Sequence, residues 1–420
     1  MIGARKKLVV AAAAVLATAV ACGSSSSGAS GGSSPSASAG GQTANKVYKI
    51  GVLTDLTGAA SSSAKTTVEG IKAGAVLASG EGYTIKYVVG DTQTSPTATL
   101  SVVQKMVTQD HVSAVIAASA LTFLASNYLT AHHIPVVGAA NDGPEWTTAK
   151  NMFSIFGAVH LTKVSTTFGK FLKMQGVTNL ASIGYSVSPS SAEAAKAAAE
   201  SAKAAGIKVG YLNAQFPFGS TNVGPEVLAM KKAGVDGFIG SIDPNTAFAL
   251  ITALRQQGVN IKVALLPTGY GGDLIQAGPG ALKAAQNVYF SLAYEPVEMQ
   301  TAATKTLVAD LKTAGITGEP TVAEYWGYLS VGLLVQGLKA AGGTPSQAAL
   351  IQALSNIHDY NAQGLFGSHK LDINDRVNIV TGADNCLWMS KLEGSSFKLV
   401  AGADPVCGTV IPGKTVSPSS

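Results

Sequence analysis

The sequence predicts an α/β protein with two Rossmann-like lobes, each built on a mostly parallel sheet and joined by a hinge of several chain segments. From residue 46 onward, apolar runs rich in β-branched residues alternate with helical patterns, which is the order of β-α-β units. The alternation restarts near residue 160, so the chain has material for two sheets. With 46% hydrophobic and 13% charged residues, it has enough apolar surface for two cores.

The first series of elements begins at Lys46. Its strands are expected in YKIGVLTD, YTIKYVVGD, VSAVIAAS and IPVVGAA, and its helices in AKTTVEGIKAGAVLAS, SPTATLSVVQKMVTQD and ALTFLASNYLTAHH. In the second of these helices, Ser95 is placed to cap the N-terminus and Pro96 to occupy the first turn. Ordered in this way, the elements predict a parallel sheet with helices on both faces.

The second series repeats the pattern. Its strands are expected in NLASIGYS, IKVGYLNA, VDGFIGSI and IKVALLPTG, and its helices in FGKFLKMQG, SSAEAAKAAAESAKAAG, GPEVLAMKKAG and NTAFALITALRQQG. Two later helices, TAATKTLVADLKTAG and TVAEYWGYLSVGLLVQGLKAAG, have no strand between them and are assigned to the first lobe. The strand-like tail that follows is assigned to the second lobe. A chain that crosses between lobes more than once forms a natural hinge.

These assignments divide the chain into five parts. The predicted parts are a signal peptide over 1–21, a lipidated cysteine and flexible linker over 22–45, lobe 1 over 46–158 plus 292–363, lobe 2 over 159–291 plus 364–411, and a disordered tail over 412–420.

The N-terminus has the features of an export signal. Basic residues at 5–7 precede an apolar segment over 8–21 that is too short to span a bilayer. With small residues just before Cys22, the segment resembles a bacterial lipoprotein signal, in which the cysteine is lipidated and anchors the chain to the membrane. The alternative is an ordinary cleaved signal with Cys22 an incidental thiol. The linker is almost entirely Ser, Gly and Ala, which offer too little apolar surface to fold.

The remaining cysteines predict a disulfide, and the charge pattern argues against nucleic-acid binding. In an exported protein, Cys386 and Cys407 are expected to form a disulfide, which would add roughly 3 kcal/mol of stability on the chain-entropy model; the alternative is two buried free thiols. The formal charge of +5 falls to +2 without the three basic residues of the signal. Because no basic stripe carries interleaved aromatic residues, nucleic-acid binding is not expected.

Two strand ends of the first lobe are candidate ligand contacts, since ligands bind beyond the carboxyl ends of parallel strands. Ser119 ends the third strand, and its hydroxyl together with the following N–H groups, beginning with Ala120, would form an anion site for a carboxylate. The alternative is that Ser119 is only a helix cap. After the fourth strand, the small residues Ala139 and Ala140 would let a ligand approach the backbone. Asn141 and Asp142 would add an amide and a carboxylate, unless this is simply a polar connecting loop.

The second lobe offers further candidates at its own strand ends. They are Ser190 in GYSVSPSS, Ile242 and Asp243 in GSIDPNT, and Thr268 and Tyr270 in LLPTGYGGD. Asp243 precedes a proline and is equally well placed to start a helix. Tyr270 could be a stacking ring over the ligand or an ordinary surface tyrosine.

Catalytic, metal and cofactor motifs are missing from the sequence. It has no G-x-S-x-G nucleophile elbow and no phosphate-binding P-loop, and the adjacent pair His132 and His133 is not spaced to share one metal ion. We therefore expect neither an enzyme nor a bound metal or cofactor.

At these loops the sequence resembles the type I periplasmic binding proteins, specifically the Leu/Ile/Val-type lipoproteins of ABC importers. The resemblance covers about residues 46–390. It rests on IGVLTDLTG with VEGIKAG one helix later, on VVGDTQTSPTAT, on AVIAAS followed by AHHIPVVGAAND and PEWT, and on EYWGYLSVGLLVQGLKAAG. The order and spacing of these pieces are more specific than any single piece.

The resemblance implies roles for several residues. Ser119 and the loop from Ala139 to Asn141 match the positions that hold the ligand's carboxylate in that family. Ser63 and Ser190 stand where its members often place aromatic residues. Thr268 stands where amino-acid binders have an acidic residue for the ammonium group. A preference for amino acids therefore does not follow, although Asp142 or Asp243 could supply the negative charge.

The expected function is capture of a solute outside the cytoplasm. We expect a monomeric, lipid-anchored binding protein that closes on a small carboxylate-bearing solute, either an amino acid or a related amide or organic acid, and delivers it to an ABC permease in the membrane. One alternative is a ligand-sensing module for a membrane signalling protein. Another is a secreted hydrolase using Ser119 or Asp142, for which the sequence offers no activating base.

Overall fold

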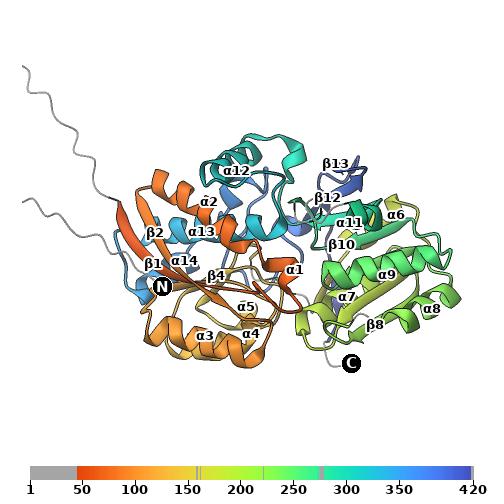
Figure 1. The fold of residues 1–420 in the computed structure, drawn as a ribbon, viewed down its shortest axis with the longest axis horizontal. Coiled ribbons are helices and arrows are strands. Elements are labelled where there is room, and N and C mark those ends of the chain that lie inside the picture. Colours follow the sequence, from red (N-terminus) through yellow and green to blue (C-terminus); the bar gives the residue numbers. More distant parts are fainter. Residues whose placement is uncertain are drawn as a thin grey trace, which may run out of the picture. The chain divides into compact units, whose positions relative to one another are not determined.

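The computed structural model describes residues 45–157, 159–160, 162–220, 222–272, 274 and 279–417, which form two α/β lobes (Figure 1). The predicted signal peptide, Cys22 and nearly all of the linker lie outside these residues. No helix in the described ranges combines the length and apolarity needed to span a bilayer. The predicted class, two lobes with parallel sheets, is confirmed.

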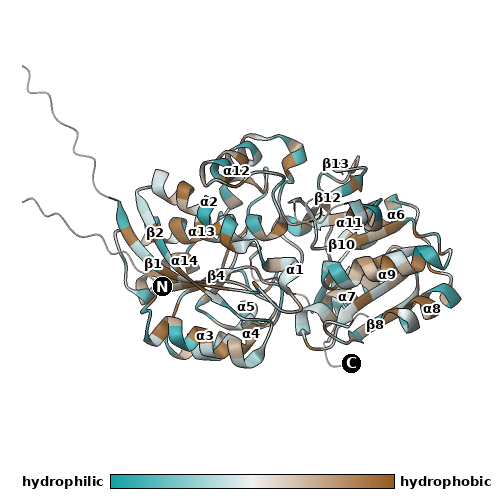
Figure 2. Cartoon of the chain, viewed as in Figure 1, coloured by the Kyte–Doolittle hydropathy of each residue, from teal (hydrophilic) through white to brown (hydrophobic). Residues whose placement is uncertain are grey.

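The first lobe contains a sheet of five parallel strands in the order β2-β1-β3-β4-β5. Its strands are β1 (Lys46–Thr54), β2 (Tyr83–Asp91), β3 (Ala114–Ala118), β4 (Val136–Gly138) and β5 (Met152–Ser154). The centre of this sheet is apolar: every residue of β3 and β4 is buried. Figure 2 shows these central strands in the hydrophobic colour.

Helices cover both faces of this sheet (Figure 1). They are α1 (Ser61–Ala64), α2 (Thr67–Gly80), α3 (Pro96–Thr108), α4 (Thr122–Ala131), α5 (Glu145–Thr148), α12 (Ala302–Thr313), α13 (Val322–Ala341) and α14 (Gln347–Ser355). Helix α3 begins as predicted, with Ser95 accepting a hydrogen bond from the Ala98 N–H and Pro96 in the first turn. The two late helices predicted for this lobe, α12 and α13, both pack on α2.

Helices α2 and α13 pack with their backbones in close approach. A Cβ atom on Gly70 would lie 2.1 Å from the carbonyl oxygen of Glu324, and one on Gly327 would lie 2.3 Å from the carbonyl oxygen of Thr67. Any other residue at either glycine would push the helices apart. A capping box between Thr321 and Glu324 fixes the start of α13.

The second lobe contains a larger, mixed sheet in the order β13-β12-β11-β10-β9-β7-β8, with β14 paired to β12. Neighbours from β8 to β11 are parallel, whereas β12 and β13 add antiparallel strands at one edge. The strands are β7 (Asn179–Tyr185), β8 (Lys208–Phe216), β9 (Gly237–Ser241), β10 (Val263–Leu266), β11 (Val288–Leu292), β12 (Cys386–Glu393), β13 (Ser396–Leu399) and β14 (Val406–Cys407). The strand-like tail therefore returns to the second lobe, as predicted.

The helices of the second lobe pack around this sheet. They are α6 (Thr167–Met174), α7 (Pro189–Ala204), α8 (Gly224–Ala233), α9 (Pro244–Gln256) and α11 (Pro279–Ala285). Helix α7 packs on β7 and β8 through its alanine-rich buried face.

The chain passes between the lobes three times, from β5 to β6 (Lys163–Ser165), from β11 to α12, and from α14 to β12. These crossings form the hinge that the sequence predicted.

The C-terminal segment corrects one prediction and agrees with another. A disordered tail was expected from residue 412, but β15 (Val410–Thr415) pairs antiparallel with β6, whose backbone groups satisfy those of the tail. The structure joins Cys386 and Cys407 in a disulfide between the paired strands β12 and β14. His369 lies near both sulfur atoms, and its Nδ1 is 2.9 Å from Asp384. Because the disulfide leaves neither sulfur as a thiolate, this trio is not a metal centre in the structure.

Candidate ligand-binding site

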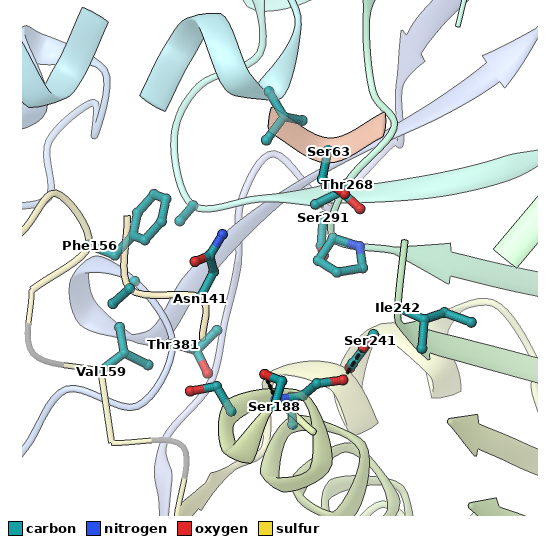
Figure 3. Close-up of a pocket in the computed structure, with 18 of the residues that line it drawn as sticks. Ser63, Asn141, Phe156, Val159, Ser188, Ser241, Ile242, Thr268, Ser291 and Thr381 are labelled. Atoms are coloured by element: carbon teal, nitrogen blue, oxygen red, sulfur yellow. Dashed lines mark hydrogen bonds between the residues drawn. The ribbon is translucent and has the colours of Figure 1, made fainter. Parts of the chain in front are cut away.

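A cavity of about 290 Å³ lies between the two lobes and is lined by residues from both. Most of its polar lining comes from segments that follow the carboxyl ends of parallel strands, where ligands of open α/β sheets bind. Its volume is near the lower end of the range for small-molecule sites. Figure 3 shows Ser63 and Asn141 of the first lobe and Ser188 and Ile242 of the second around this common space.

The structure places most of the predicted contact residues in this cavity. Its lining includes Ser63, Ala120, Ala140, Asn141, Ser190, Ile242, Asp243 and Thr268. Four predicted residues are buried and are not among the lining: Ser119, Ala139, Asp142 and Tyr270.

The predicted anion site is filled by a carboxylate of the chain itself. Asp55, which directly follows β1, accepts hydrogen bonds from Ser119 Oγ at 2.6 Å and from the Ala120 N–H at 2.8 Å. Thr92 donates a third hydrogen bond to the same carboxylate. Burial raises the pKa of Asp55, and these hydrogen bonds act against that rise. Ser119 therefore lies behind Asp55, and its hydroxyl is not available to a ligand's carboxylate.

Asp142 also stabilises the first lobe instead of facing the cavity. Its carboxylate accepts hydrogen bonds from the Phe123 N–H at 2.7 Å and from Trp146 Nε1 at 2.9 Å. Its backbone carbonyl accepts from Ser188 Oγ and from the Ser190 N–H, both in the second lobe. Burial and the negative charge of Asp142 raise the pKa of the neighbouring Glu145, so that this carboxyl group holds a proton at neutral pH.

Tyr270 belongs to the core and is neither a ring over the ligand nor a surface residue. It is 1% exposed, and its ring contacts Phe290, Phe397 and Tyr325. Its hydroxyl donates to the carboxylate of Glu298. The Gly-rich sequence around Tyr270 suggested an exposed loop, but the aromatic neighbours come from segments distant in sequence.

Asp243 is the acidic residue that the second lobe contributes to the cavity. It is the N-cap residue of α9, as its following proline suggested, yet its side chain makes no capping hydrogen bond. Its carboxylate instead accepts from Tyr185 hydroxyl at 2.8 Å and, across the cavity, from Ser63 Oγ at 3.1 Å. Burial raises the pKa of Asp243 to about 6, and the charge of Asp55 contributes to that rise. The two carboxylates therefore influence each other through the same space.

Aromatic side chains form the apolar walls, and the sequence analysis missed them. They are Phe156, Phe168, Tyr185, Phe218, Tyr294 and Trp326. Tyr185 packs edge-on against Phe218 with ring centroids 4.8 Å apart, and Phe156 stacks with Tyr294 at 6.2 Å. The strand-end rule could have identified Tyr185, which is the last residue of β7. Trp326 lies within α13, and nothing in its local sequence points to a ligand.

Two polar atoms at the cavity lack partners. Asn141 Oδ1 and Thr268 Oγ1 are buried without a hydrogen bond among the described residues (Figure 3). Unpaired buried acceptors are costly, and a ligand that donates to them relieves that cost. The described lining contains no histidine and no cysteine.

Comparison with known protein families identifies the family to which this chain belongs. The sequence profile described as periplasmic binding protein matches residues 47–395, most of the chain. The chain belongs to the periplasmic binding protein family. The resemblance seen in the sequence is thereby confirmed: the family comprises type I solute-binding proteins of ABC importers, which act outside the cytoplasm and are not enzymes. No curated protein sequence matches this periplasmic binding protein.

Solved structures with the same fold share little of its sequence. A leucine-binding protein from Thermotoga maritima is 18% identical, with a TM-score of 0.68 over 84% of this chain and 98% of that one. A branched-chain amino acid transporter binding protein from Streptococcus pneumoniae, solved with isoleucine, is 20% identical, with a TM-score of 0.69 over 87% and 99%. A solute-binding protein from R. palustris, solved with 4-hydroxybenzoate, is 17% identical, with a TM-score of 0.69 over 84% and 96%.

Proposed function

We propose that this periplasmic binding protein captures a small organic solute between its lobes and delivers it to an ABC permease. The observation that carries the proposal is the cavity lined by strand ends of both lobes, bridged by the hydrogen bond from Ser63 to Asp243. A solute in this cavity touches both lobes at once, so it binds the closed form better than the open form. That difference in affinity allows a permease to distinguish loaded from empty protein.

The ligand has an apolar body and hydrogen-bond donors. Aromatic rings supply the walls of the cavity, and its polar lining comprises carboxylate, amide and hydroxyl groups together with Lys163. The expectation of a carboxylate-bearing solute depended on Ser119 and the Ala120 N–H. Because both groups donate to Asp55, we do not extend that expectation to the ligand. Isoleucine and 4-hydroxybenzoate are ligands of the similar structures, and they define the size of compound to screen first.

We further propose that Cys22 carries the lipid that anchors the chain. A single acyl chain holds a protein to a membrane only weakly, so stable anchoring requires more than one. Mass spectrometry of the protein from its native membrane would show lipid on an N-terminal Cys22. A Cys22→Ser variant is expected in the soluble fraction, and its retention in the membrane would contradict the anchor.

The function is tested by ligand screening followed by uptake. The full-length protein is screened by thermal shift against amino acids, amides, amines and aromatic acids, because a ligand that binds the native state raises Tm. Uptake of any labelled hit is then compared in cells with and without this chain. Binding with loss of uptake supports the proposal. Binding with unchanged uptake indicates a sensory module, and failure of every compound to bind contradicts solute capture.

A further inference from the structure

Three side chains of the cavity lining, Asp55, Asp243 and Asn141, carry carboxylate or amide oxygens that accept hydrogen bonds. Asp55 receives three hydrogen bonds, Asp243 receives two through its side chain, and Asn141 Oδ1 receives none from the described residues. Two carboxylate oxygens together accept about four hydrogen bonds. Capacity to accept is therefore left on both carboxylates and on the amide.

The two carboxylates come from opposite sides of the cavity. Asp55 follows β1 in the first lobe, and Asp243 follows β9 in the second. Both are buried, at 1% and 7% exposed. Bringing two negative charges into one poorly solvated space is unfavourable unless a positive charge joins them.

No cation of the described chain is directed at this pair. Lys163 is the positively charged residue among the described lining, and its Nζ donates to the carbonyl oxygen of Val377 in the hinge. The hydroxyl groups of Ser63 and Tyr185 contact Asp243, but they are neutral. Among the described residues, no cation forms an ion pair with Asp55 or Asp243.

The walls of the cavity also suit an organic cation. Tyr185 and Phe218 meet edge to face on the second-lobe side, and Phe156 and Tyr294 stack near the hinge. The face of an aromatic ring attracts a positive charge, and this attraction is strongest where water is excluded. An inorganic ion would leave these rings without a contact, whereas an amine or amidine with an apolar body meets both the rings and the carboxylates.

We propose that the ligand is an organic cation with N–H donors, a primary ammonium or an amidinium on an apolar body, held between Asp55 and Asp243 and needing no carboxylate. This inference rests on the proposed function and names the chemical class of its solute. In the structure, Ser63 Oγ occupies one acceptor site of Asp243. The cation adds donors to the same carboxylate and so links the two lobes by charge.

The experiment uses three probes of nearly the same shape and different charge: benzamidinium, benzamide and benzoate. Their affinities for the full-length protein are measured at pH 7.5 by isothermal titration calorimetry. We expect benzamidinium to bind at least about tenfold more tightly than benzoate, with benzamide between them. Tighter binding of benzoate, or no binding by any probe, would overturn the inference. If the wider screen still yields a ligand, solute capture stands although its charge class was wrong.

Substitutions test whether the charge of Asp243 is responsible for the tighter binding of benzamidinium. Asp243→Asn is expected to weaken benzamidinium about tenfold and benzamide less than about threefold, because only the cation loses a charge partner. Asp359→Asn is the matched control, since this exposed carboxylate lies outside the cavity, and it should leave both affinities unchanged. Equal losses for both probes in Asp243→Asn would contradict the charge contact. Should that variant fail to fold, lowering the pH of the wild type from 7.5 to 5 protonates Asp243 and should weaken benzamidinium alone.

Discussion

Asp55 and Asp243 stand at equivalent places in the two lobes, each just beyond the end of a parallel strand, yet they do different things. Asp55 receives three hydrogen bonds from its own lobe, donated by Ser119, Ala120 and Thr92. The side chain of Asp243, the N-cap residue of α9, makes no capping hydrogen bond and instead accepts one from Ser63 across the cavity. The same residue type at the same topological position can therefore be held mainly by its own lobe in one case and form a contact between the lobes in the other. What distinguishes them is the number of donors that the lobe itself provides.

Replacing each aspartate by alanine should reveal the largest difference between Asp55 and Asp243, in the free energy of unfolding. Asp55→Ala should lower the free energy of unfolding by about 4 kcal/mol, because it leaves three buried donors without an acceptor. Asp243→Ala should cost about 1 kcal/mol, since burial already disfavours its charge. Urea denaturation measures both values. Asp359→Ala, at the surface, should change stability by less than about 0.5 kcal/mol. Equal losses at Asp55 and Asp243 would remove the distinction between them.

The buried Glu145 of the first lobe should make the stability of the protein depend on pH. Because its pKa is raised in the folded state, the native protein keeps a proton that the unfolded chain releases, so stability increases as the pH falls. Lowering the pH from 8 to 5 should therefore stabilise the protein, and Glu145→Gln should remove the part of this gain that comes from Glu145. Denaturant titrations at the two pH values measure it. An unchanged pH dependence in the variant would mean that Glu145 is ionised in the native state.

In the second lobe, Asp243 should also make the protein more stable as the pH falls, but by a smaller amount. Asp243 has a pKa of about 6 in the folded protein, above its ordinary value of 3.8, so the stability it contributes appears as the pH falls through 6. Between pH 8 and pH 5 the gain should be about 1 kcal/mol, and Asp243→Asn should abolish it. A variant that keeps the full pH dependence would show that other groups cause it.

The hydrogen bond between the lobes should give the smallest change. Ser63→Ala removes the donor to Asp243 and should lower stability by about 0.5 kcal/mol, because the pair is only partly buried. Ser62→Ala is the control one residue away, as Ser62 Oγ is buried without a partner among the described residues. Small-angle scattering should show a more open average for Ser63→Ala. Identical behaviour of the two variants would argue against a link between the lobes at this point.

Periodicity predicted most of the long elements of both lobes but missed several others. The alternation of apolar strands and helices, together with Ser95 and Pro96 at one helix start, gave the parallel sheets and the return of α13 to the first lobe. Helix α5 and strands β5 and β6 were missed, because three or four residues carry too little periodic signal. Helices α11 and α14 and strand β11 were also not predicted, although they are longer. The tail strand β15 was missed because its pairing with β6 depends on contact with a distant segment.

Strand ends predicted part of the cavity lining, and the role of these residues as ligand contacts stays a prediction. Eight of the predicted contact residues line the cavity because the strand-end rule is topological. The role of Ser119 could not be predicted, since it depends on Asp55, a residue 64 positions earlier in the sequence. Trp326 was missed for the same reason: its place at the cavity follows from the packing of α13 on α2.

The three crossings between the lobes bear on resistance to proteases outside the cytoplasm. If one crossing is cut, two continuous covalent routes still join the halves, and the disulfide from Cys386 to Cys407 holds the last strands of the second lobe together. A nicked molecule can thus keep both walls of its cavity in place. Resistance to proteolysis outside the cytoplasm then follows from the path of the polypeptide itself.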